Sequence, residues 1–99
     1  MQIPKKFKIS GKTFTVKVTD TMPRPRRMGE FNATLHAIDL GTKSNVTGRV
    51  FKTEEVSDTF WHEVTHAILH DMGHPLWNNE KFVTAFSSRL NEVVNTAKL

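Results

Sequence analysis

The sequence contains no cysteine, no tyrosine and no long run of apolar residues among its 99 positions. The missing cysteines exclude disulfide bonds and thiolate metal ligands, and they favour a cytoplasmic location. The segment from Met1 to Phe7 lacks the apolar stretch of a signal peptide, and no other stretch is long enough to cross a bilayer. We therefore expect one small domain over residues 1–99, without a secretion signal or membrane association.

The charge balance is modestly basic, with 14 lysines and arginines against 10 acidic residues and a formal net charge of +4. Lysines cluster near the N-terminus, and Arg24, Arg26 and Arg27 lie in a proline-containing segment. Such clusters can bind nucleic acid. No aromatic residues alternate with them and no nucleic-acid motif accompanies them, so we favour a solvated basic surface, which also suits an acidic protein substrate.

The most informative segment is His62-Glu63-Val64-Thr65-His66. In a helix, His62 and His66 lie about one turn apart and project from one face, so two imidazole nitrogens can bind a single zinc ion. Glu63 is rotated by roughly 100° and can reach a metal-bound water. The motif predicts two of three zinc ligands and the general base of a zinc hydrolase.

The residues around this motif predict a buried helix. Thr53 is the expected N-cap, and Gly73 is the expected C-terminal stop. Histidine and glutamate in the middle of such a helix cost free energy unless they are paired or metal-bound. The alternative is two core histidines bonded to the backbone beside a solvated glutamate. Apolar residues occupy more than one stripe of the segment, namely Phe60, Trp61, Val64, Ala67, Ile68, Leu69 and Met72.

A zinc hydrolase usually has three protein ligands and leaves the fourth position to water. The candidates for the third ligand are His36, His70, Asp71, His74 and Glu80. His70 follows His62 by two turns, about 12 Å along the axis, so a straight helix cannot bring both to one ion. Glu80 is preferred, because the chain turns after the first helix and returns Glu80 in the opening turn of a second helix. His74 is the alternative.

The order of the elements predicts an α+β domain, with an antiparallel N-terminal sheet packed on the buried motif helix and a second, C-terminal helix. Alternating residues predict a β-hairpin over 7–9 and 13–18, and two extended pieces are expected over 30–33 and 37–40. The core face of the hairpin would carry Phe7, Ile9, Phe14, Val16 and Val18. The second helix would begin at Asn78 or Asn79. Its apolar positions are Phe82, Val83, Phe86, Leu90, Val93, Val94 and Ala97.

The segment from Thr59 to Ile68 resembles the extended signature of the zincin metallopeptidases, which has Thr or Val three residues before the first histidine and a hydrophobic residue two after the second. From about Lys52 to Val94 the chain also resembles small, often phage-encoded, minimal gluzincins related to the ImmA/IrrE-like metallopeptidases. In gluzincins a glutamate of the next helix completes the ligand set, in a context similar to the one around Glu80.

This resemblance implies a zinc metalloendopeptidase, a hydrolase of polypeptides. It implies zinc bound by His62, His66 and Glu80, with Glu63 as the catalytic base. Family members also have an edge strand that pairs with an extended substrate, a role for which residues 29–40 are the candidates and for which an ordinary internal hairpin is the alternative.

Two positions depart from better-known gluzincins. An aspartate often stands four residues after the ligand glutamate, where this chain has Thr84, so a zinc-binding histidine has to be oriented by Asp58, Asp71 or a backbone carbonyl. Thermolysin-like enzymes stabilise the tetrahedral intermediate with tyrosine and histidine. Without tyrosine this role falls to His36, His74 or an arginine of residues 24–27.

Two other functions stay open. ImmA/IrrE-like proteins act on transcriptional repressors, so the resemblance also allows a phage-type antirepressor, a regulatory protease specific for a single protein partner. The other is a non-catalytic binding module stabilised by zinc. A structural zinc site normally has a fourth protein ligand, and His74 is the residue that can provide it.

Overall fold

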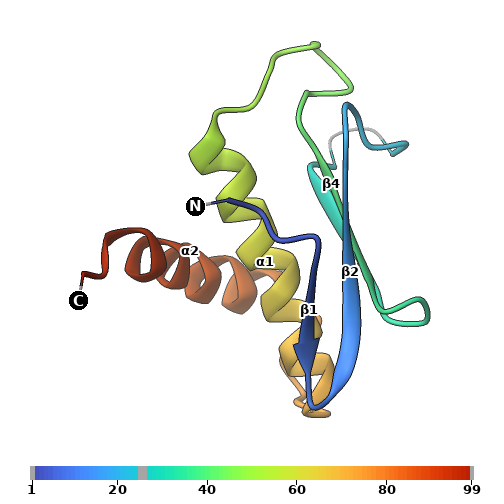
Figure 1. The fold of residues 1–99 in the computed structure, drawn as a ribbon, viewed down its shortest axis with the longest axis vertical. Coiled ribbons are helices and arrows are strands. Elements are labelled where there is room, and N and C mark those ends of the chain that lie inside the picture. Colours follow the sequence, from blue (N-terminus) through green and yellow to red (C-terminus); the bar gives the residue numbers. More distant parts are fainter. Residues whose placement is uncertain (1, 25–26, 99) are drawn as a thin grey trace.

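The computed structural model describes residues 2–24 and 27–98, so Pro25 and Arg26 of the basic segment lie outside the described residues. Four strands precede two helices: β1 Lys6–Ile9, β2 Lys12–Thr19, β3 Gly29–Asn32, β4 Ala37–Gly41, α1 Thr53–Asp71 and α2 Glu80–Thr96. Helix α1 runs alongside the sheet, and α2 extends from the opposite side of α1 (Figure 1). The predicted α+β class and the predicted hairpin are confirmed.

The strands form one mixed sheet in the order β1-β2-β4-β3. β1 pairs antiparallel with β2, and β3 pairs antiparallel with β4, but β2 and β4 are parallel, with Val16 opposite Ile38. The expected antiparallel sheet is therefore wrong. The chain leaves β2, crosses to the edge as β3 and returns as β4 beside β2, so these two strands point the same way. Residue periodicity reports which face a strand buries, but not this crossover.

The hydrophobic core lies between the sheet and α1. Ile38 and Leu40 of β4 are fully buried, and they form one cluster with Phe60 and Val64 of α1. Of the predicted hairpin face, Phe7 and Val16 pack against this core and Phe14 is buried, but Val18 is 48 % exposed. The residues of β2 that pair with β1 end before Val18, which leaves that end of the strand uncovered.

Helix α1 begins at Thr53, one residue earlier than the prediction of Thr53 as its cap. Lys52 is the N-cap, and its backbone N–H donates to the Glu55 carboxylate over 3.0 Å, so Thr53 is already helical. The helix ends at the predicted stop, Gly73. This residue has a φ of +65°, and its N–H donates to the His70 carbonyl over 3.0 Å. This cap fixes the direction in which the chain leaves α1.

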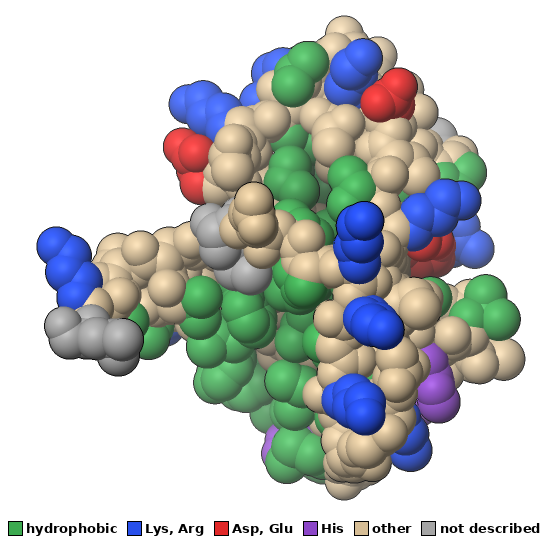
Figure 2. All heavy atoms as spheres, in the orientation of Figure 1, with side chains coloured by type: hydrophobic (Ala, Val, Ile, Leu, Met, Phe, Trp, Pro, Cys, Tyr) green, Lys and Arg blue, Asp and Glu red, His purple; other side chains and the backbone are tan. Residues whose placement is uncertain are grey.

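Several predicted apolar positions of the two helices are exposed. Met72, the C-cap of α1, is 64 % exposed. On α2, Phe86 and Val93 are 49 % and 60 % exposed, and Figure 2 shows hydrophobic side chains at the surface on the α2 side of the molecule. Val83 of α2 is fully buried, and a polar contact also joins the helices, since buried Ser57 donates to Asn91 Oδ1 over 2.6 Å. No helix in the described part of the chain is long and apolar enough to cross a membrane.

Candidate metal centre

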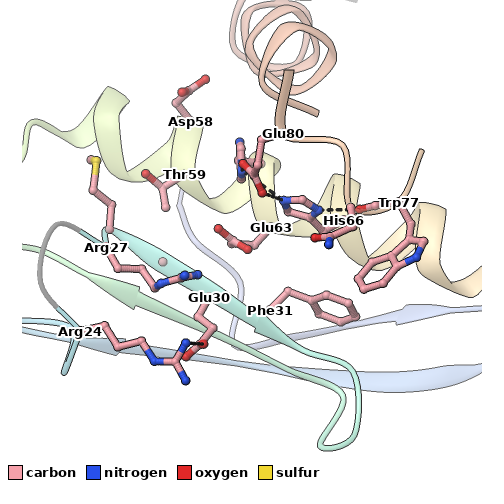
Figure 3. Close-up of a pocket in the computed structure, with 14 residues that line it drawn as sticks. Arg24, Arg27, Glu30, Phe31, Asp58, Thr59, Glu63, His66, Trp77 and Glu80 are labelled. Carbon is pink, nitrogen blue, oxygen red and sulfur yellow. Dashed lines mark hydrogen bonds and ion pairs between the residues drawn. The ribbon is translucent and has the colours of Figure 1, made fainter. Parts of the chain in front are cut away.

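Three side chains from two helices converge beside the sheet. His62 and His66 lie one turn apart on α1, and their Nε2 atoms are 3.2 Å apart. Glu80, the first residue of α2, places one carboxylate oxygen 3.0 Å from His62 Nε2 and the other 2.8 Å from His66 Nε2. The donor atoms of all three residues lie within 4.8 Å of one another, and Figure 3 shows the carboxylate directed at the imidazole of His66.

The cap of α2 brings this glutamate to the site. Asn79 accepts a hydrogen bond from the Phe82 N–H over 2.9 Å, so the helix starts at Glu80, as the sequence predicts within one residue. The Gly73 turn at the end of α1 reverses the chain before that cap. Two local signals, a glycine stop and an asparagine cap, therefore bring a residue of α2 back to the middle of α1.

The spacing of the donor atoms fits a zinc ion. Zinc–nitrogen and zinc–oxygen bonds of about 2.0–2.2 Å place two tetrahedral donors about 3.3 Å apart. Here the two Nε2 atoms are 3.2 Å apart, and each lies 3.0 or 2.8 Å from a different oxygen of Glu80, so an expansion of a few tenths of an ångström would make room for the ion. Two imidazoles and one carboxylate also form a donor set that zinc prefers.

A backbone carbonyl orients one of the histidines. His66 Nδ1 lies 2.7 Å from the carbonyl oxygen of Trp77, which can only accept a hydrogen bond. Nδ1 therefore carries the proton, and the Nε2 lone pair faces the other two residues of the group. Of the orienting groups considered from the sequence, Asp71 lies elsewhere, bonded to Ser10 and Lys12 over 2.6 and 3.1 Å.

Burial tunes the titratable groups of the site. It lowers the pKa of His62, against the charge of Glu80, which favours the neutral imidazole that binds metal. Glu63 is 7 % exposed, and burial raises its pKa to about 7, with the charge of His66 acting in the opposite direction. A carboxyl group with such a pKa exchanges a proton near neutral pH, as a general base must.

The other histidines considered from the sequence lie outside this group. His36 stacks on Phe14 with ring centroids 4.9 Å apart. His70 packs against the ring of Trp77, with centroids 4.9 Å apart, consistent with its exclusion on helix geometry. His74 Nδ1 accepts a hydrogen bond from the Leu76 N–H over 3.1 Å. The group contains no fourth histidine or carboxylate from the residues that the structure describes.

A cleft of about 620 Å³ opens onto the group between α1, β3 and the chain before α2 (Figure 3). β3 is an edge strand, and its outer side has no partner strand among the described elements. The Gly41 N–H donates to the Met28 carbonyl over 2.9 Å, and hydrogen-bonded pairs alternate along an antiparallel ladder. The backbone N–H and C=O groups of Gly29 and Phe31 therefore point outward, away from β4.

Comparisons with protein-family models, with curated proteins and with solved structures found no match to this chain. A function can therefore be inferred only from the residues of the site, their geometry and their chemistry.

The hydrogen bond between His66 and the Trp77 carbonyl could not be predicted from the sequence, because it uses a main-chain oxygen that every residue has.

Proposed function

We propose that this chain is a zinc-dependent metalloendopeptidase of the zincin type. In this proposal His62, His66 and Glu80 hold the ion, and Glu63 is the general base. The observation that carries it is the position of Glu80, whose Oε2 lies 3.0 Å from His62 Nε2 and whose Oε1 lies 2.8 Å from His66 Nε2. A two-histidine motif alone supplies an incomplete site, and a third donor from a separate helix completes the set of a catalytic zinc centre.

Zinc, when bound, polarises the scissile carbonyl and makes the attacking water more acidic. Glu63 accepts a proton from that water and returns it to the leaving amine. Its burial supports this role, because a desolvated carboxylate binds a proton more readily than an exposed one. The Trp77 carbonyl keeps the Nδ1 proton on His66, so that Nε2 can donate its lone pair.

The open edge of β3 supports a polypeptide as the substrate. An extended peptide can add to this edge through the outward backbone groups of Gly29 and Phe31. The same strand lines the cleft that contains Glu63, so a peptide bound there would pass the proposed base. This arrangement favours a substrate-binding edge over an ordinary internal hairpin.

The alternative of a structural zinc module is less well supported. A structural site normally closes with four protein ligands, and the residue suited to be the fourth, His74, is bonded to the Leu76 N–H instead. An antirepressor protease with one protein partner would use the same centre, and would differ in the range of polypeptides that it cleaves.

Glu63→Gln tests the proposal. The amide has nearly the same shape, cannot act as a base and does not contact the donors of the group. We expect unchanged zinc content and circular dichroism, with hydrolysis of a mixed peptide library lowered roughly 10²- to 10⁴-fold. Glu54→Gln, at an exposed position of the same helix, is the matched control and should keep full activity.

Equal cleavage by wild type and Glu63→Gln would remove Glu63 from the mechanism. If the zinc-loaded wild type cleaves neither the library nor a bound protein partner, the binding-module alternative is correct. Cleavage of one partner protein alone would identify the regulatory form of the protease.

A further inference from the structure

The two ends of the cleft differ in chemistry. The end nearest the start of β3 is lined by Arg24 and Arg27, and the other end is lined by Phe31 and Trp77 (Figure 3). The proposed base, Glu63, lies between these two ends in the same view. A peptide that crosses the site therefore meets a basic wall on one side of its scissile bond and an aromatic wall on the other.

At the basic end, one positive charge forms no ion pair among the residues that the structure describes. Arg24 is compensated by Glu30, since Arg24 Nη1 and Glu30 Oε1 are 3.6 Å apart. Asp58 also lines this end, but it projects from α1 one turn before His62, and its charge acts on that imidazole. Arg27 forms no ion pair with any carboxylate of residues 2–24 and 27–98, although its charge acts on the Glu63 carboxyl, whose pKa burial raises and this charge lowers. Figure 3 shows its guanidinium group directed into the cleft.

At the aromatic end, Phe31 and Trp77 line the cleft, and the ring of His70, which is not part of the lining, connects them. The His70 ring lies between the other two, with its centroid 4.9 Å from that of Trp77 and 5.7 Å from that of Phe31. Trp77 is held beside the site by the hydrogen bond that its carbonyl accepts from His66, yet it is 38 % exposed. Such a wall offers apolar contact area to a substrate side chain, and it contains no carboxylate.

The edge of β3 gives the direction of the bound peptide. Antiparallel pairing is the more stable arrangement for an added strand. Because β3 runs from Gly29 to Asn32, an antiparallel peptide runs from the Phe31 end of the cleft towards the Gly29 end. Its residues before the scissile bond then face the aromatic wall, and those after the bond face Arg27.

We infer that the cleft selects peptides with an apolar side chain before the scissile bond and an acidic side chain directly after it, the acidic group being bound by Arg27. The inference rests on the proposed function and names the substrate class of that site. A guanidinium group suits a carboxylate because it can donate two parallel hydrogen bonds to it. The assignment makes Arg27 a specificity residue and gives it no part in the chemical step.

The first experiment profiles cleavage of a random peptide library by mass spectrometry. We expect the wild type to favour Asp or Glu directly after the cleaved bond, roughly 10-fold over Lys or Arg, as a charge-assisted hydrogen bond gives. Arg27→Glu should reverse this preference and keep the zinc content. Lys17→Glu makes the same charge change on an exposed strand position and should leave the profile unchanged. An unaltered profile in Arg27→Glu, or an acidic preference before the bond, would overturn the inference.

The second experiment separates this inference from the proposed function, because it measures binding. Two short peptides that differ only in Glu or Lys after a central Phe are titrated onto zinc-loaded Glu63→Gln. We expect the Glu peptide to bind roughly 10-fold more tightly, and the preference to disappear when Arg27→Glu is added. If the wild type cleaves nothing but this preference is found, only the hydrolase proposal fails. Equal binding of the two peptides overturns the inference whether or not the chain is a protease.

Discussion

Replacing Glu80 by glutamine separates the proposed metal-binding role of this residue from any structural role. The Glu80 side chain is 66 % exposed, although its carboxylate lies within 3.0 Å of His62 and His66. Exposed ion pairs contribute only about 0–1 kcal/mol to stability. Without metal, we therefore expect Glu80→Gln to unfold at nearly the same temperature as the wild type.

With zinc the two proteins should diverge. An ion that binds only the folded chain, at about 100 times its Kd, stabilises it by about 2.7 kcal/mol. Groups that merely orient a ligand are worth about 10- to 100-fold in metal affinity, so loss of a charged ligand should weaken binding by at least about 100-fold. At the same zinc concentration the variant would gain only about 0.4 kcal/mol. For a domain of this size, zinc would raise the Tm of the wild type by roughly 11–22 °C and that of Glu80→Gln by about 2–3 °C.

The measurement is thermal unfolding followed by circular dichroism, first with a chelator and then with buffered zinc. His70→Ala and His74→Ala are the controls, and both should keep the wild-type response to zinc because neither side chain reaches the group. A full zinc response in Glu80→Gln would refute the ligand set. So would a response that is lost in His74→Ala, which would make that histidine a ligand.

Two further predictions test the surroundings of the site. Gly29→Ala should lower the free energy of unfolding by about 1–3 kcal/mol, because the added Cβ would lie 2.7 Å from Thr59 Cγ2. Thr59→Ser removes that methyl group, so urea unfolding of the double variant should show a partial recovery, and no recovery would place the clash elsewhere. Hydrogen bonds from Arg49 lower the pKa of Glu55 to about 2. Its stabilising contribution is therefore complete above the usual pKa of 4.5 and is lost as the pH falls from there towards 2. Glu55→Gln should accordingly be less stable than the wild type at neutral pH and equally stable near the folded-state pKa. A difference that does not change with pH would contradict the pairing.

Local signals in the sequence predict most of the secondary structure. Alternation predicts the hairpin, the Gly73 stop ends α1, and Asn79 caps α2, because each depends on a few neighbouring residues. The parallel pairing of β2 with β4 could not be predicted in this way. It depends on which strand occupies the edge, and the apolar face of a strand is the same whether its neighbour runs parallel or antiparallel.

The packing of α2 shows why helical periodicity predicts less about burial. Phe86 and Val93 follow the apolar pattern but stay exposed, whereas Val83 and Ser87 are buried. The direction in which α2 leaves the Gly73 turn decides which face meets α1, and that direction also places Glu80 beside His66. A helix rotated to bury Phe86 would turn this carboxylate away from the imidazoles, since both positions belong to one rigid helix. The exposed apolar face of α2 is therefore a geometric consequence of the orientation that assembles the candidate metal centre.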